Sequence, residues 1–210
     1  MLFSDYSVKY SIVNLTVPTF NGSIPVVSVN NWIVILNRFN GSVDFLRNWT
    51  EYRNGFGNPL TGEYWFGLEK IRQLTFSAPY RLRIELQTLV EGSWFSTEYY
   101  SFLIDTEQNG YTLYVSGYSG DAGDGLAYTA VSTSYQNGTK FSTFDADNDN
   151  NDGTCTTVVG GGSFWFNSCC YCCLTSPFGT QFYYWHPFTD PPAVSSSAQL
   201  KASRMMIKLQ

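Results

Sequence analysis

The chain has 210 residues, of which 18% are aromatic and 14% charged, and its formal net charge is −5. This size and composition suit one folded domain with a sizeable core and exclude an intrinsically disordered protein. Neither a Lys/Arg-rich run nor an apolar run of membrane-spanning length occurs, so we expect no nucleic-acid partner and no membrane insertion.

The first part of the chain predicts a strand followed by two short helices. Trp32–Leu36 is almost wholly apolar and predicts a buried strand. Ser42 suits a helix N-cap and Gly55 suits the end of that helix, because apolar residues recur between them at helical spacing. Leu68–Leu74 predicts the second helix. The apolar residues of the first helix are Phe45, Trp49, Tyr52 and Phe56.

Strands are predicted in the middle and at the end of the chain. Tyr80–Gln87 alternates apolar and polar residues, as a half-buried strand does. Tyr99–Ile104, Tyr111–Val115 and the final Leu200–Leu209 have similar character. From Ser116 onward Gly, Ser, Asp and Asn dominate, and such long loops need a crosslink or a bound ion to hold them.

The most distinctive motif is the acidic segment Asp145–Cys155. Four aspartates fall within eight residues, interleaved with three asparagines and followed by a glycine, and they supply −4 of the net charge. A packed core does not accept uncompensated charges, whereas calcium takes six to eight oxygen ligands from such side chains. The segment therefore predicts a calcium loop, although its composition does not choose among the four aspartates.

Two other interpretations of the acidic segment compete with a calcium loop of this kind. An EF-hand fails, because Asn150 stands where the sixth-position glycine belongs if Asp145 is first, and no glutamate occupies position twelve. A solvated acidic turn without a metal stays open as the simpler alternative.

All five cysteines lie in the last third of the chain, and their odd number leaves at least one thiol unpaired or bonded to another chain. Cys169/Cys172 and Cys170/Cys173 both have the CxxC spacing found in zinc sites. Adjacent cysteines make poor simultaneous zinc ligands, and His186 is the only histidine. An additional disulfide, within the chain or to another chain, is favoured over zinc.

Sequons and the cysteine that ends the acidic segment indicate a secreted, extracellular protein. The segment beginning at Met1 lacks a basic region followed by an apolar stretch, so it is no signal peptide, and we expect the natural start to lie elsewhere. The Asn-x-Ser/Thr sequons are at Asn14, Asn21, Asn40, Asn48 and Asn137.

No group of residues predicts catalysis, so we expect a binding protein and not an enzyme. His186 lies among aromatic residues, no Gly-x-Ser-x-Gly motif occurs, and the glycines at 160–162 lack the Lys-Ser/Thr of a phosphate-binding loop. Aromatic residues near the C-terminus could line a sugar or acetyl-group pocket, and each is equally compatible with the core. These aromatic residues are Tyr171, Phe178, Tyr183 and Tyr184.

A series of motifs in order resembles the fibrinogen C-terminal domain family, which includes fibrinogen chains, ficolins, tachylectins, angiopoietins and tenascins. The resemblance covers roughly residues 30–175, with a weaker match near the C-terminus. An ordered series of this kind is far more specific than one motif. Its motifs include Trp32-Ile33-Val34-Ile35, Asn40–Trp49, Tyr52–Asn58, Gly62–Ile71, Tyr118–Asp124, Lys140–Thr143, the acidic segment and Trp165–Cys169.

The resemblance implies an α+β fold with a central twisted antiparallel sheet, short flanking helices and a loop-rich calcium-binding lobe. It implies that Asp147 and Asp149 bind calcium through their side chains, and Asn151 and Gly153 through their backbone carbonyls. Asp145 would help from the outer shell. The resemblance also implies a disulfide between Cys155 and Cys169. Closing that segment would contribute about 3 kcal/mol in the chain-entropy model.

The resemblance also implies a ligand pocket beside this disulfide. Cys170 departs from the family pattern, which commonly has a ligand-binding histidine there, and residues 180–199 lack the expected Trp-rich segment. Both departures weaken the assignment of a ligand. The predicted pocket residues are Ser168, Cys169, Cys170, Tyr171, Phe178 and Tyr183.

These observations predict a single domain over residues 1–210, with approximate lobes at 1–50, 51–130 and 131–199 and a returning strand at 200–210. The expected function is calcium-dependent recognition of a glycan or acetylated group, as in ficolin- and tachylectin-like lectins of innate immunity. The alternative is a protein-binding module that acts as a ligand of a cell-surface receptor or as a matrix or clot assembly element. Upstream regions or an unpaired cysteine would allow a homo-oligomer.

Overall fold

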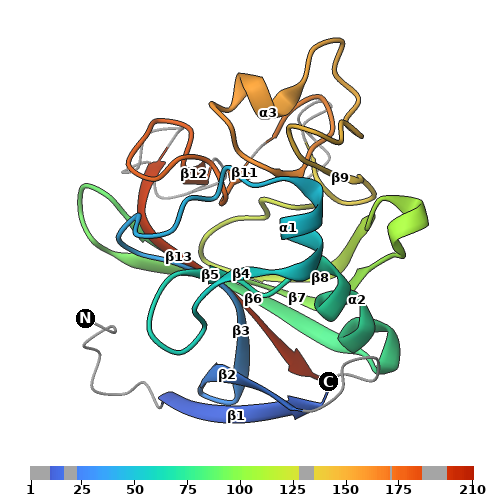
Figure 1. The fold of residues 1–210 in the computed structure, drawn as a ribbon. Helices are drawn as coiled ribbons and strands as arrows, with labels where there is room; N and C mark the ends of the chain where they lie inside the picture. Colours follow the sequence, from blue (N-terminus) through green and yellow to red (C-terminus); the bar gives the residue numbers. More distant parts are fainter. Residues whose placement is uncertain (1–9, 17–22, 128–134, 171, 186–197) are drawn as a thin grey trace.

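The computed structural model describes the chain except for residues 1–9, 17–22, 128–134, 171 and 186–197. An eleven-stranded antiparallel sheet dominates the fold, and its main path has the spatial order β1-β2-β3-β13-β6-β7-β8 (Figure 1). The strands of this path are β1 (Tyr10–Thr16), β2 (Ser23–Val29), β3 (Trp32–Arg38), β6 (Tyr80–Thr88), β7 (Trp94–Ile104), β8 (Leu113–Gly120) and β13 (Ala198–Leu209).

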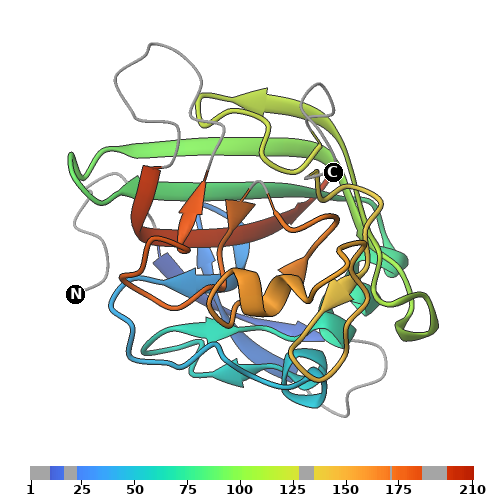
Figure 2. The same ribbon diagram turned by 90° about the horizontal axis from the view of Figure 1, so that it is seen from above.

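The last strand lies in the middle of this sheet. β13 pairs with β3, where Met205 lies opposite Leu36, and with β6, where Met205 lies opposite Ile84. All three side chains are fully buried. Figure 2 shows β13 in dark red beside the green strands β6 and β7. The strand predicted over Leu200–Leu209 is therefore confirmed, and it begins two residues earlier than predicted.

The alternating pattern of β6 is confirmed residue by residue. Burial alternates strictly along Tyr80–Thr88, with the apolar side chains and Thr88 buried and the Arg, Glu and Gln side chains on the outer face. On that outer face Arg83 forms ion pairs with Glu85 and with Glu98 of β7. One face of the strand thus packs in the core, while the other carries a charge network.

The helices α1 (Trp49–Asn54) and α2 (Leu68–Ser77) pack against each other, and α2 also packs against β7. Figure 1 shows both of them on one side of the sheet. The second helix confirms its prediction and extends three residues further. The prediction that the first helix starts at Ser42 is wrong. Its N-cap is Asn48, whose side chain accepts from Glu51 N at 2.9 Å, while the Glu51 carboxylate accepts from Asn48 N at 3.1 Å.

Glu63 fixes residues 39–43, which precede this helix. Its buried carboxylate accepts hydrogen bonds from four backbone N–H groups of that segment. Burial alone would raise the pKa of the Glu63 carboxyl, but the four hydrogen bonds outweigh it and hold the pKa below its usual value. The donors are Phe39 N at 2.6 Å, Asn40 N at 2.9 Å, Gly41 N at 2.9 Å and Val43 N at 3.0 Å.

The strand predicted over Tyr111–Val115 is displaced in the structure. Tyr111 has a left-handed φ of 49° and precedes β8, which continues to Gly120. The polar composition from Ser116 onward therefore does not end the strand. Glycine is required at position 117 within this strand. Its φ is +73°, and a Cβ there would lie 2.7 Å from the Tyr100 Cβ of β7.

Residues 136–185, called the loop lobe below, contain little regular structure. Strands β9 and β10 form a small separate sheet, whereas β11 pairs with β12, which pairs with β13. Strands β4 and β5 connect to β3 elsewhere in the fold. The elements are β9 (Phe141–Ser142), α3 (Cys155–Val158), β10 (Phe164–Trp165), β11 (Cys172–Cys173) and β12 (Tyr184–Trp185), besides β4 (Phe56–Gly57), β5 (Tyr64–Trp65) and the 3-10 helix η1 (Glu107–Asn109).

Aromatic packing joins the loop lobe to the rest of the molecule. Phe141 of β9 lies 5.1 Å from the Tyr52 ring of α1 and 6.1 Å from the Trp65 ring of β5, between ring centroids. The Trp165 ring of β10 lies 5.1 Å from Phe141. Because these rings are fully buried, the lobe shares the core of the sheet. The predicted division into lobes stays a prediction, and its boundary at 130/131 lies outside the described residues.

None of the helices among the described residues has the length and apolar character needed to cross a membrane.

Candidate functional site

The acidic segment forms a loop between β9 and α3. It begins in a tight turn, in which Thr143 and Ala146 pair as an isolated bridge. It ends where Cys155 starts α3. Figure 1 shows this part of the loop lobe at the edge of the molecule beside α1. The aspartates are exposed except Asp149, which is half-buried.

Asp145 fastens the loop to the first helix. Its Oδ1 accepts a hydrogen bond from Trp49 N at 2.9 Å and one from Thr143 Oγ1 at 2.7 Å. Trp49 is the first residue of α1, so this carboxylate also lies at the positive end of a helix. Asp145 thus shapes the loop from its edge, and its predicted outer-shell role stays a prediction.

Asp147 and Asp149 lie side by side within the loop. Asp147 Oδ1 accepts from Asp149 N at 3.2 Å. The Asp149 oxygens accept from Asn151 N at 2.9 Å and from Cys155 N at 2.8 Å. Burial raises the pKa of the Asp149 carboxyl despite these bonds, and the Asp147 carboxylate raises it further by repulsion. A bound cation would relieve both penalties.

Asn151 and Gly153 could supply the remaining oxygens. The Asn151 side-chain Nδ2 donates to the sulfur of Cys169 at 2.9 Å, which fixes this residue beside the disulfide. Among the described residues, neither the Asn151 nor the Gly153 carbonyl oxygen accepts a backbone hydrogen bond. Two carboxylates and two such carbonyls within seven residues are a donor set of hard oxygens, which suits calcium better than zinc.

A disulfide and a pair of asparagines brace this loop. Cys155 and Cys169 form a disulfide, with their Cα atoms 4.9 Å apart and a sequence separation of 14. Asn150 donates from its backbone N to Asn167 O at 2.9 Å and from its side chain to Asn167 Oδ1 at 2.8 Å. Both halves of the loop are therefore fixed to the segment that leads to Cys169.

The predicted ligand pocket is only partly assembled. Ser168, Cys169 and Cys170 are half-buried neighbours in the chain, whereas Tyr171 lies outside the described residues. Cys169 has a left-handed φ of 64°, which few residues other than glycine adopt.

Phe178 and Tyr183 belong to a different cluster, around the buried Arg38 of β3. Their ring centroids lie 5.5 Å apart, and the Arg38 guanidinium lies 4.7 Å from the Tyr183 ring. Tyr183 is fully buried, and its hydroxyl lies 2.6 Å from Ser203 Oγ of β13. A side chain without accessible surface does not line an open pocket, so we place Tyr183 in the core and correct the prediction.

Arg38 is a structural residue that the sequence did not single out. It is 1% exposed, and its Nη1 donates to Leu174 O at 3.0 Å and to Ser176 O at 2.5 Å. Its guanidinium also lies 4.2 Å from the Phe45 ring. The available signal was a charged residue two positions after an apolar run, but its hydrogen-bond acceptors lie more than 130 residues away and leave no local pattern.

The three remaining cysteines lie close to the disulfide. Cys170 is half-buried, and Cys172 and Cys173 are fully buried. Within the described ranges, no three His, Cys, Asp or Glu side chains are grouped as metal ligands, and His186 lies outside those ranges. The zinc alternative therefore receives no support from the described residues.

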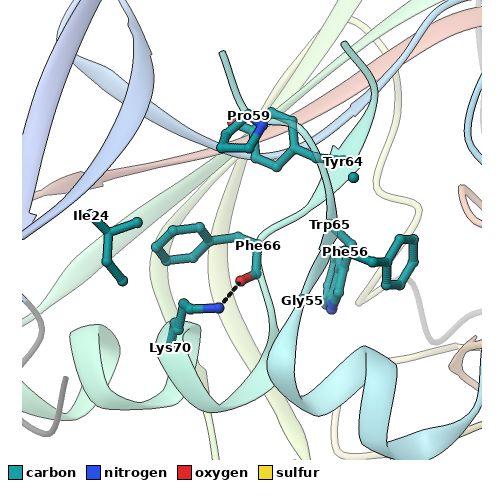
Figure 3. A pocket seen from close by; sticks show the side chains of 9 residues that line it. Ile24, Gly55, Phe56, Pro59, Tyr64, Trp65, Phe66 and Lys70 are labelled. Carbon is teal, nitrogen blue, oxygen red and sulfur yellow. Dashed lines mark hydrogen bonds between the residues drawn. The ribbon is translucent and has the colours of Figure 1, made fainter. Parts of the chain in front are cut away.

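A small, mostly apolar pocket of about 150 Å³ lies away from the acidic loop, between β2, β4, β5 and α2 (Figure 3). Lys70 lines it, and its ammonium donates to Phe66 O at 3.2 Å and to Asn54 O. Burial lowers the pKa of Lys70. No predicted site residue lines this pocket. Its other lining residues are Ile24, Gly55, Phe56, Gly57, Pro59, Tyr64, Trp65 and Phe66.

Comparison with known proteins places this geometry in a family. The family described as "Fibrinogen beta and gamma chains, C-terminal globular domain" matches residues 26–207. Bovine angiopoietin-4 is 38% identical over 205 residues, and mouse microfibril-associated glycoprotein 4 is 42% identical over 144 residues. These matches cover 94% and 66% of this chain, but only 38% and 52% of the relatives' own lengths.

Solved structures agree with the family match. The fibrinogen-like globe domain of human ANGPTL6 superposes with a TM-score of 0.82 and 29% identity, over 96% of this chain and 90% of that one. Lamprey fibrin D-dimer, complexed with the peptide Gly-His-Arg-Pro-amide, superposes with a TM-score of 0.76 and 30% identity. That superposition covers 97% of this chain and 70% of the lamprey protein.

Proposed function

The protein belongs to the family of C-terminal globular domains of the fibrinogen beta and gamma chains, and from that premise we propose that it is an extracellular, non-enzymatic domain that recognises a protein. The family resemblance and the α+β fold predicted from the sequence motifs are both confirmed. The observation that carries the proposal is the similarity to a fibrin domain that was solved with a bound peptide.

A protein partner is better supported than the glycan or acetylated ligand expected from the sequence. The similar proteins include angiopoietins and a microfibril-associated glycoprotein, and none of the names given above denotes a lectin. The described residues also give little support to a sugar pocket, because Tyr183 is in the core and Cys170 replaces the histidine expected there. A receptor ligand and a matrix-assembly element both fit this proposal.

Calcium is proposed as a structural support of the recognition surface. The side chains of Asp147 and Asp149 and the carbonyls of Asn151 and Gly153 would hold it. With a Kd of about 0.1 mM, typical of extracellular modules, and about 1 mM free calcium, binding would stabilise the fold by about 1.4 kcal/mol. The ion would neutralise two adjacent carboxylates and fix the loop in one conformation.

The surface around the acidic loop has the chemistry of a protein interface. Phe144, which directly precedes the loop, is 55% exposed, and Val158 on α3 is 53% exposed. Asp147 and Asp152, which lie between these two residues in the sequence, are also exposed. Exposed apolar side chains beside acidic groups suit a partner surface that combines apolar and basic residues.

A cell-binding experiment tests whether the partner is a protein. The labelled full-length protein is added to cultured animal cells in 1 mM calcium, a concentration about that of extracellular fluid. We expect binding to disappear after the cells are treated with trypsin. It should persist after enzymatic removal of N- and O-glycans and in excess N-acetylglucosamine. Retention of the protein on N-acetylglucosamine beads, with elution by the free sugar, would overturn the proposal in favour of a lectin.

A matched pair of variants tests the part that calcium plays. Asp147→Asn removes a proposed ligand, and Asp152→Asn makes the same change of charge in the same loop outside the ligand set. We expect EGTA and Asp147→Asn to weaken cell binding alike, and Asp152→Asn to behave as the wild type. Equal loss in both variants would show that the charge of the loop matters and not the ion.

A further inference from the structure

Three cysteines lie outside the Cys155–Cys169 disulfide, and the structure divides them into a pair and a single thiol. Cys172 and Cys173 are consecutive residues of β11, so their side chains point to opposite faces. The Cys172 sulfur lies 3.6 Å from Gly125 O and 3.5 Å from Gln136 Oε1. Cys172 is therefore directed away from the other two thiols.

Cys170 and Cys173 face each other. The two thiols are near enough for each to shift the pKa of the other. The contacts of Tyr184 place the two residues together independently, because Tyr184 is the strand partner of Cys173. Its hydroxyl lies 3.6 Å from the Cys170 sulfur and donates to Cys170 O at 3.1 Å. Both cysteines thus adjoin the same residue of β12.

The turn that follows Cys173 is built to support a thiolate. Ser176 Oγ donates to the Cys173 sulfur at 2.8 Å, and the backbone of Thr175 and Ser176 helps to lower the pKa of Cys173. On the other side of this turn, Arg38 binds the carbonyls of Leu174 and Ser176. Burial raises the pKa of Cys173, but the donors outweigh it and lower the pKa below its usual value.

Cys170 has the opposite character. It is half-buried, whereas Cys173 is fully buried, so Cys170 is the more accessible residue of the two. Its interaction with Cys173 and its burial raise the pKa of Cys170, so this thiol keeps its proton. An accessible thiol beside a stabilised thiolate, at CxxC spacing, is the arrangement that closes readily into a disulfide.

We propose that Cys170 and Cys173 are an oxidisable dithiol, which closes into a second intrachain disulfide and leaves Cys172 as the one free thiol. A low-molecular-weight disulfide such as oxidised glutathione is the oxidant. Cys170 passes its proton to the Cys173 thiolate and attacks one glutathione sulfur, which breaks that disulfide and releases one glutathione as a thiolate. The released glutathione takes the proton from Cys173, whose thiolate then attacks the Cys170 sulfur and releases the second glutathione, which is protonated by water. Two protein thiols are oxidised, and one glutathione disulfide is reduced to two thiols.

The second disulfide would connect the acidic loop to the main sheet. Cys169 and Cys170 are consecutive, so the two disulfides together would connect α3 covalently to β11. β11 pairs with β12, which pairs with the central β13. Oxidation would therefore anchor the acidic loop to the sheet. This inference does not depend on the proposed partner or on calcium.

Thiol counting on the full-length protein tests the proposal. The purified protein is equilibrated in glutathione buffers of increasing oxidised fraction and quenched with acid. It is then unfolded and alkylated, and the number of alkylated thiols is measured by mass spectrometry of the intact protein. We expect one alkylated thiol in the oxidised wild type and none in Cys172→Ser. Three alkylated thiols in the wild type at every ratio that keeps Cys155–Cys169 closed would overturn the pairing. A covalent dimer that persists in Cys172→Ser would overturn it too.

Two further variants test the order of the steps. In Cys173→Ser no second thiol can displace the glutathione, so we expect a stable glutathione adduct on Cys170. In Cys170→Ser we expect two free thiols and no adduct, because Cys173 and Cys172 are buried. An adduct on Cys173 instead would contradict the proposed order. If Cys173→Ser fails to fold, the wild type and Cys172→Ser still decide the pairing.

Discussion

The main sheet and the loop lobe are both well buried, yet different interactions hold them. In the sheet, long strands pair with their neighbours in extended register, and Leu82, Ile84 and Leu86 of β6 are fully buried between them. The loop lobe has fully buried aromatic residues as well, but no strand in its described part is longer than two residues. Regular pairing satisfies the backbone of the first region and does not satisfy that of the second.

Side chains take over the role of backbone pairing in the loop lobe. Gln136 Nε2 donates to Cys172 O at 2.7 Å, Trp165 Nε1 to Tyr111 O at 2.8 Å, and Trp185 Nε1 to Ala122 O at 2.8 Å. A buried backbone carbonyl needs a partner, and here each partner is a specific side chain. The lobe therefore depends on individual groups, whereas the sheet depends on the total apolar area that it buries.

The largest effect is expected where one buried group serves several backbone donors. Glu63→Ala leaves four N–H groups without their acceptor, each worth about 1–3 kcal/mol, so we expect a loss of about 5 kcal/mol. Urea unfolding at pH 7 measures it. A loss below about 1 kcal/mol, the value of one ordinary hydrogen bond, would mean that water replaces the carboxylate.

The same residue predicts a pH dependence. The folded-state pKa of Glu63 lies below its unfolded value of 4.5, so its stabilising contribution is present above pH 4.5 and is lost as the pH falls through the folded pKa. Stability curves of the wild type and Glu63→Gln should therefore converge in acid. Parallel curves from pH 7 to pH 3, a range of about four units, would assign the pH dependence to other carboxyl groups.

The second largest effect tests the sheet. Ile84→Ala removes a fully buried side chain between β13 and β7, and we expect a loss of about 3–4 kcal/mol from the lost burial and the cavity. The loss should be the same in calcium and in EGTA, because the sheet does not contain the proposed ion. A loss that doubled in EGTA would show that the sheet and the acidic loop unfold as one calcium-linked unit.

Removal of the Cys155–Cys169 disulfide tests the loop lobe in the same way. We expect the double variant Cys155→Ala/Cys169→Ala to lose about 3 kcal/mol, because the unfolded chain regains the freedom of the closed segment. Hydrogen exchange should accelerate at residues 141–170 and stay unchanged in β6. Faster exchange throughout β6 would contradict the separate origins of stability in the two regions.

The smallest effect is that of the proposed ion. Chelation with EGTA should destabilise the wild type by about 1.4 kcal/mol and lower the Tm by about 3–6 °C. Asp147→Asn should have the lower Tm already and not respond to EGTA, while Asp152→Asn should respond as the wild type. An unchanged Tm of the wild type on chelation would support the simpler interpretation of the acidic segment as a solvated turn.

Local sequence patterns predicted the regular elements well where burial is repetitive. The alternation of Tyr80–Gln87 and the apolar C-terminal segment identified β6 and β13, and the short pattern at Leu68–Leu74 identified α2. The first helix starts later than expected because Asn48, and not Ser42, forms the capping box with Glu51. No pattern within residues 39–43 reveals a carboxylate that lies 20 or more residues away in sequence.

In the candidate site, too, local features could be predicted from the sequence and long-range contacts could not. The composition of the acidic segment was enough to predict its chemistry, and the ordered motifs were enough to identify the family. The roles of single residues were less accessible: Tyr183 was expected in a pocket and lies in the core, whereas Arg38 was not expected in any role. Both depend on contacts with segments that approach only in the folded protein.

The amino-acid sequence by itself determined the strand periods, the family and the concentration of oxygen donors in one loop, because each of these is a property of neighbouring residues. The tertiary structure decided which buried charges are satisfied, which aromatic rings are core, and which of three thiols face each other. Those outcomes depend on distances between segments far apart in sequence, which no local pattern contains.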